Sequence, residues 1–85
     1  MDDKNVTYIG HDCSDMIFSQ RDKSIGSNEW IAWVVWDTGH QGITFCAKTE
    51  QAAIDSARDF YERWRVARAI SLNSAIEFLW QHQDI

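Results

Sequence analysis

Two segments in the middle of the chain carry the clearest pattern of hydrophobic and polar positions. Residues 30–36, Trp-Ile-Ala-Trp-Val-Val-Trp, are almost entirely aromatic or β-branched, a composition that suits the pleated surface of a β-strand. Residues 43–48 alternate in character, as a strand with one buried face does. The connection between them, residues 37–42, contains Gly39 and Gly42, and glycine favours a tight turn. The pattern predicts an antiparallel hairpin.

The register of this hairpin decides which side chains share a face. Placing Asp37 opposite Ile43 also pairs Val35 with Phe45 and Trp33 with Ala47. The predicted core face then consists of Ile31, Trp33, Val35, Ile43, Phe45 and Ala47. The opposite face carries Trp30, Ala32, Val34 and Trp36 beside Thr44, Cys46 and Lys48. A slip of one residue would exchange the two faces.

A long amphipathic helix is predicted after the hairpin. Thr49 is a suitable N-cap, and Glu50 places a negative charge in the first turn. Apolar residues recur at spacings of three and four and form a stripe: Ala53, Ala57, Phe60, Trp64 and Ala67. A capping-box pattern at residues 74–77 predicts a break within residues 71–74 and a short final helix carrying Ile76, Leu79 and Trp80. One uninterrupted helix is the alternative.

Three of the four arginines of the long helix have an acidic neighbour one turn away. We expect the surface ion pairs Asp55 with Arg58, Asp59 with Arg63, and Glu62 with Arg65. A solvated, salt-bridged face is therefore favoured over a nucleic-acid-binding face for the cluster Arg58, Arg63, Arg65 and Arg68.

Two shorter β-prone runs, residues 6–9 and 16–18, precede the hairpin. Together the elements predict an α+β fold: a three- or four-stranded antiparallel sheet packed by one long helix, with a shorter C-terminal helix beside it. At 85 residues the chain has room for one domain, residues 1–85. Trp33, Trp64 and Trp80 are expected in its core.

Charge narrows the class of partner. The chain has 8 basic and 13 acidic residues, a net charge of −5, and most of the excess lies in residues 1–40. Such a field repels phosphate backbones and attracts basic surfaces. The longest apolar run, residues 30–36, is too short to cross a bilayer, and the acidic N-terminus does not resemble a secretory leader. We expect a cytoplasmic protein whose two cysteines, Cys13 and Cys46, stay reduced.

Few residues suit metal binding or catalysis. His11, Cys13, His40 and Cys46 are the kinds of side chain that bind zinc, but their spacing does not match a zinc motif. No flanking motif supports His11 or His40 as a base for a nucleophile. We therefore expect no metal, no cofactor and no enzymatic activity.

The five tryptophans are the most unusual feature of the composition. If the register holds, Trp30 and Trp36 project from the face opposite the core, unless an N-terminal element covers them. Rigid aromatics with a charged rim are typical of protein-binding hot spots. The predicted partner-binding residues are Trp30, Trp36, Glu29, Asp37, Asp12 and Asp15.

In size and acidity the chain resembles small inhibitor proteins, namely toxin-neutralising immunity proteins and phage-encoded anti-defence proteins such as anti-CRISPRs; no sequence motif supports this likeness. It implies a non-enzymatic inhibitor that blocks a basic, nucleic-acid-binding surface of a nuclease or defence complex. An adaptor or homodimer that self-associates through the same apolar face is the alternative. A minor enzyme using His11 or His40 is the third.

Overall fold

The computed structural model describes residues 4–9, 14–24, 26 and 28–81. Four strands, β1 (Asn5–Tyr8), β2 (Met16–Arg21), β3 (Trp30–Val35) and β4 (Gln41–Ala47), precede two helices, α1 (Glu50–Ile70) and α2 (Leu72–Gln81). The strands form one antiparallel sheet in the order β1-β2-β3-β4. The predicted α+β fold, with a central hairpin, a long helix and a short C-terminal helix, is confirmed.

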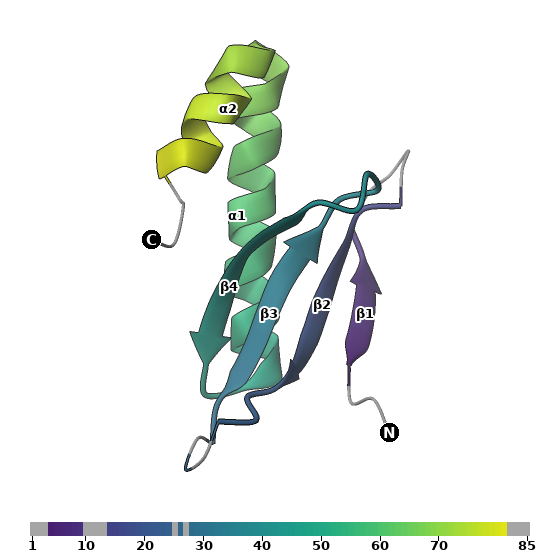
Figure 1. The fold of residues 1–85 in the computed structure, drawn as a ribbon, viewed down its shortest axis with the longest axis vertical. Helices are drawn as coiled ribbons and strands as arrows, with labels where there is room; N and C mark the ends of the chain where they lie inside the picture. The colour runs from purple at the N-terminus through teal and green to yellow at the C-terminus, as the bar shows by residue number, and fades with distance from the viewer. Residues whose placement is uncertain (1–3, 10–13, 25, 27, 82–85) are drawn as a thin grey trace.

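One face of the sheet is covered by α1, which contacts β2, β3 and β4. In Figure 1, β3 and β4 cross in front of α1, and the sheet face toward the viewer carries no helix. Among the described elements, α2 contacts only α1, near its C-terminal end. Within these residues, neither helix combines the length and hydropathy that crossing a membrane requires.

The core lies between α1 and the covered face. Ala32 and Val34 of β3, Ile17 of β2, and Ala53 and Ala57 of α1 are fully buried. Small side chains on both surfaces allow the helix to approach the middle of the sheet closely. Trp30, Trp36, Phe45 and Trp64 pack around this centre.

The predicted register is wrong. Trp33 pairs with Thr44 and Ala32 with Phe45, and an irregularity between Trp33 and Val35 brings Val35 opposite Gln41. For residues 30–33 the pairing differs from the predicted one by three residues. Because this number is odd, the side chains of β3 lie on the opposite face from the predicted one relative to those of β4. The covered face of β3 therefore carries the set predicted to point away from the core: Trp30, Ala32, Val34 and Trp36.

The break between the helices is confirmed, and it lies at Ser71, the first residue of the predicted range 71–74. Thr49 caps α1 as expected, since its hydroxyl accepts a hydrogen bond from the Ala52 N–H at 3.1 Å. Ser71 ends α1, and its Oγ accepts a hydrogen bond from the Ser74 N–H at 3.0 Å, so Ser71 caps α2. The capping-box pattern at residues 74–77 lies inside α2, because Ser71 is an equally good cap three residues earlier.

Two of the three predicted ion pairs of α1 form. Arg63 Nε lies 3.1 Å from Asp59, and Arg65 lies 3.7 Å from Glu62. Asp55 instead accepts a hydrogen bond from Gln51 at 2.8 Å. These are exposed contacts on the solvent side of α1, as the sequence predicts.

Candidate partner-binding surface

The sheet face that α1 leaves uncovered, here called the outer face, is built by strand alternation. Phe18 pairs with Val6 on one side and with Trp33 on the other, and Trp33 pairs with Thr44. Residues two positions away point the same way. The outer face therefore also includes Tyr8, Met16, Gln20, Ile31 and Cys46.

Aromatic rings dominate the β1 to β3 part of the outer face. Tyr8 is 72% exposed, and Val6 beside it is 44% exposed. Phe18 and Trp33 are half-buried and in ring contact, with centroids 5.8 Å apart. The Lys4 ammonium lies over the Phe18 ring at 5.5 Å, so this surface already holds one cation. An apolar, aromatic surface that none of the described helices covers is suited to binding a partner.

Trp30 and Trp36 lie on the opposite face from the predicted one. Trp36 packs edge-on against Phe60 and Trp64, and its indole N–H is buried without a hydrogen-bond partner among the described residues. Trp30 packs at the edge of the core, with the Arg21 guanidinium 5.6 Å from its ring. The prediction that both indoles project from an open face is wrong. They also cannot form one compact hot spot, because six residues along a strand span about 20 Å.

Asp15 is a buried structural residue, with 4% of its surface exposed. Its Oδ1 accepts a hydrogen bond from the Asp37 N–H at 2.8 Å, and its Oδ2 accepts one from the Tyr61 hydroxyl. It therefore ties the start of β2 to the β3–β4 turn and to α1. The prediction that Asp15 forms part of an exposed acidic rim is wrong, because both carboxylate oxygens are used inside the protein.

The other predicted rim residues lie at the ends of β3. Glu29 immediately precedes the strand and Asp37 follows it by two residues, and both are exposed. Asp12 lies outside the described residues. Glu29 and Asp37 thus flank β3 and are next to Trp30 and Trp36 in the chain, although those two indoles pack against the core.

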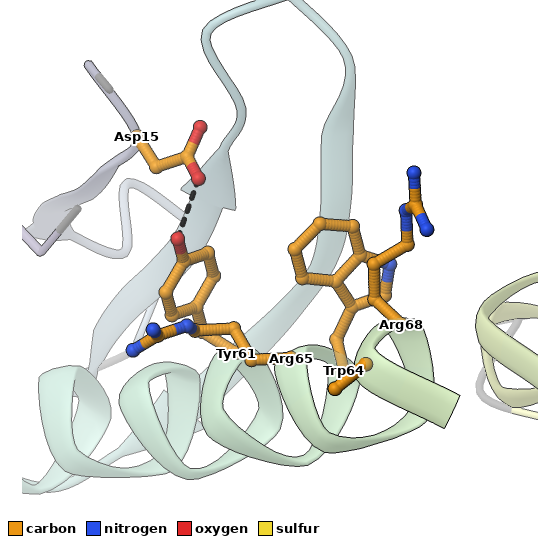
Figure 2. A pocket seen from close by; sticks show the side chains of 6 residues that line it. Asp15, Tyr61, Trp64, Arg65 and Arg68 are labelled. Atoms are coloured by element: carbon orange, nitrogen blue, oxygen red, sulfur yellow. Dashed lines mark hydrogen bonds between the residues drawn. The ribbon is translucent and has the colours of Figure 1, made fainter. Parts of the chain in front are cut away.

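A shallow pocket of about 350 Å³ lies beside α1, lined by Asp15, Tyr61, Trp64, Arg65, Arg68 and Ala69. In Figure 2 the Tyr61 hydroxyl meets Asp15, the Trp64 indole stands next to it, and the two arginines point in different directions. Tyr61 and Trp64 stack at 5.8 Å. The floor of the pocket is formed by the hydrogen bond between Tyr61 and Asp15, and its rim carries Arg65 and Arg68. Because the rim is positively charged, this side of α1 is not suited to a basic partner.

The residues considered for metal binding and catalysis are not brought together. His11 and Cys13 lie outside the described residues. His40 is exposed, and its Nδ1 lies 2.9 Å from the Thr38 hydroxyl. Cys46 is an exposed free thiol six residues further along the chain, roughly 20 Å away in an extended strand. In the described ranges, no group of three or more His, Cys, Asp or Glu side chains is placed to hold a metal.

Comparisons with protein-family models, with curated proteins and with solved structures found no match to this chain.

Proposed function

We propose that this chain is a non-enzymatic binding protein that docks the outer face of its sheet onto a basic surface of a protein partner. The observation that carries the proposal is the uncovered aromatic surface formed by Tyr8, Phe18 and Trp33. Aromatic residues are enriched where protein interfaces gain most of their binding energy. No catalytic role is assigned to any residue.

Charge and ring chemistry select the class of partner. The net charge of −5 attracts a basic surface and speeds encounter with it. The exposed carboxylates Glu29 and Asp37 lie at both ends of the central strand. Aromatic faces also bind guanidinium and ammonium groups, as Lys4 does on Phe18. A partner surface rich in arginine and lysine therefore fits both the negative net charge of the chain and the aromatic rings of its outer face.

Basic surfaces of this kind are used by nucleases and other nucleic-acid-binding complexes to hold phosphate backbones. A protein that occupies such a surface excludes the nucleic acid and acts as an inhibitor. In this proposal the chain works in the cytoplasm, in the manner of anti-CRISPR, anti-restriction or toxin-immunity proteins.

The proposal can be tested by affinity capture from a lysate of the native host. The wild-type chain is compared with Tyr8→Ala on the outer face and with Ile70→Ala on α1, because these side chains are almost equally exposed, at 72% and 73%. We expect wild type and Ile70→Ala to recover the same basic protein, and Tyr8→Ala to recover little of it. Nuclease treatment should not release this protein.

Two results would contradict this function. Equal recovery by all three variants removes the outer face as the binding surface. Loss of the partner on nuclease treatment means that nucleic acid mediates the contact, against the proposed exclusion of nucleic acid.

A further inference from the structure

The helical end of the molecule exposes a second apolar surface. Of the seven large hydrophobic residues that are exposed in the described ranges, five lie on the last turns of α1 or on α2. Their exposed fractions are 65% for Val66, 73% for Ile70, 58% for Leu72, 44% for Ile76 and 66% for Trp80. Trp80 was predicted to be a core residue, and that prediction is wrong.

The spacing of these residues turns them into a stripe. Leu72, Ile76 and Trp80 recur every fourth residue of α2 and therefore lie along one side of it. The side of α2 that packs on α1 is formed by Ala75, Phe78 and Leu79, with Phe78 in ring contact with Phe60. The three exposed residues are thus left over after α2 has packed. We call Leu72, Ile76 and Trp80 the α2 stripe.

We propose that the α2 stripe binds the α2 stripe of a second copy of this chain, with the two helices antiparallel about a two-fold axis at Ile76. In this arrangement Ile76 meets Ile76, and the large indole of Trp80 covers the smaller Leu72 of the other copy. The same surface serves on both partners, as a two-fold dimer requires. Val66 and Ile70, which are exposed one turn apart at the end of α1, would extend the contact in this arrangement.

Charge favours a second copy over a charged partner at this site. Within the described part of α2, Glu77 is the only charged residue, although the chain as a whole carries −5. Two identical acidic proteins repel each other, so they associate best where charge is sparse and apolar surface is exposed. The α2 stripe meets both conditions.

The exposed apolar area of these five residues determines how tightly two copies are expected to bind. The five residues together expose roughly 300–450 Å² of mostly apolar surface, taking about 60–120 Å² for an aliphatic side chain and up to about 250 Å² for tryptophan. Two copies would bury about 600–900 Å² through them, which is less than the roughly 1,200 Å² of standard interfaces and is typical of weak, transient association. A reversible dimer with a micromolar dissociation constant is expected.

Sedimentation velocity over a concentration series tests the proposal. Ile76→Glu is compared with Val6→Glu, since both residues are 44% exposed and Val6 lies on β1, far from α2 in Figure 1. We expect Ile76→Glu to raise the dissociation constant at least tenfold and Val6→Glu to leave it within twofold of wild type. Circular dichroism confirms that both variants are folded. A wild-type chain that stays monomeric at millimolar concentration, or a dimer that only Val6→Glu disrupts, overturns the proposal.

Cysteine cross-linking tests the two-fold axis independently of affinity. In a background with Cys13 and Cys46 replaced by serine, Ile76→Cys should form a disulfide-linked dimer on mild oxidation, because residues on the axis approach their own copies. Leu72→Cys should not, since four residues from the axis place its two copies about 12 Å apart, beyond the roughly 7 Å limit for a disulfide. Efficient cross-linking of Leu72→Cys with none of Ile76→Cys overturns the antiparallel arrangement.

The outcome is separable from that of the proposed function. Tyr8→Ala should lose the partner and keep the dimer, whereas Ile76→Glu should lose the dimer and keep the partner. A dimer formed in this way leaves both outer faces free and would bind a partner bivalently.

Discussion

The hydrogen bond between Tyr61 and Asp15 gives the sharpest test of how the start of β2 is attached to α1. Tyr61→Phe removes the hydroxyl and leaves the ring, which is 3% exposed and stacked on Trp64 at 5.8 Å. The ring packing is therefore retained. The variant removes one donor from a buried carboxylate that keeps its hydrogen bond from the Asp37 N–H.

The expected cost follows from the charge of the acceptor. A hydrogen bond to a charged group contributes about 1.5–3 kcal/mol, and a buried acceptor left without its donor keeps the full desolvation penalty. We expect Tyr61→Phe to lower the free energy of unfolding by about 2 kcal/mol. For a domain of this size, that corresponds to a fall in Tm of roughly 8–16 °C.

Urea unfolding followed by tryptophan fluorescence measures this loss. Tyr8→Phe is the matched control, because Tyr8 is 72% exposed and should change the unfolding free energy by less than about 0.5 kcal/mol. In a double-mutant cycle with Asp15→Asn, the coupling energy should be at least about 1 kcal/mol, as expected of residues in contact. A loss for Tyr61→Phe no larger than that for Tyr8→Phe, or additive effects in the cycle, would refute the reasoning.

Three further variants probe other parts of the fold by the same unfolding assay. Gly42→Ala should cost about 1–2 kcal/mol by overpacking, since its Cβ would lie 3.0 Å from a Phe60 ring carbon; no loss would contradict that contact. Thr49→Ala should cost about 1 kcal/mol through loss of the helix cap, whereas Thr49→Ser should be nearly neutral. Glu50→Ala should cost about 1–2 kcal/mol, because the nearly fully buried Ser19 hydroxyl loses its acceptor at 2.9 Å; an unchanged midpoint would argue against this bond.

The hairpin could be predicted from the sequence, but its register could not. Both faces of β3 are apolar, with Ala32 and Val34 on one and Ile31 and Trp33 on the other. The alternation of side chains alone therefore does not show which face of β3 packs against α1. The irregularity between Trp33 and Val35 then shifts the pairing of β3 with β4, and no residue type in the sequence predicts it. One usable signal was present: the alanines of α1 fit closely only against the sheet face that carries Ala32.

The type of candidate site, an aromatic surface with carboxylates, could be predicted from the sequence, but the aromatic residues that form it could not. An aromatic surface near exposed carboxylates is present, and Glu29 and Asp37 lie at the ends of β3. Tyr8 and Phe18 were missed because each lies in a short strand whose orientation depends on the register of β3. The burial of Asp15 could not be predicted, since its partner Tyr61 is 46 residues away in the chain.

Protection of Cys46 tests the central claim most directly. Cys46 is an exposed free thiol on the outer face, where it pairs with Ile31. In a Cys13→Ser background, its rate of alkylation is measured with and without the captured partner, and a cysteine introduced as Arg58→Cys, at an exposed position of α1, in a chain lacking both native cysteines serves as the control. The account predicts that the partner slows alkylation of Cys46 at least tenfold and leaves the control unchanged. Alkylation of Cys46 at the free rate in the saturated complex would show that the partner binds elsewhere.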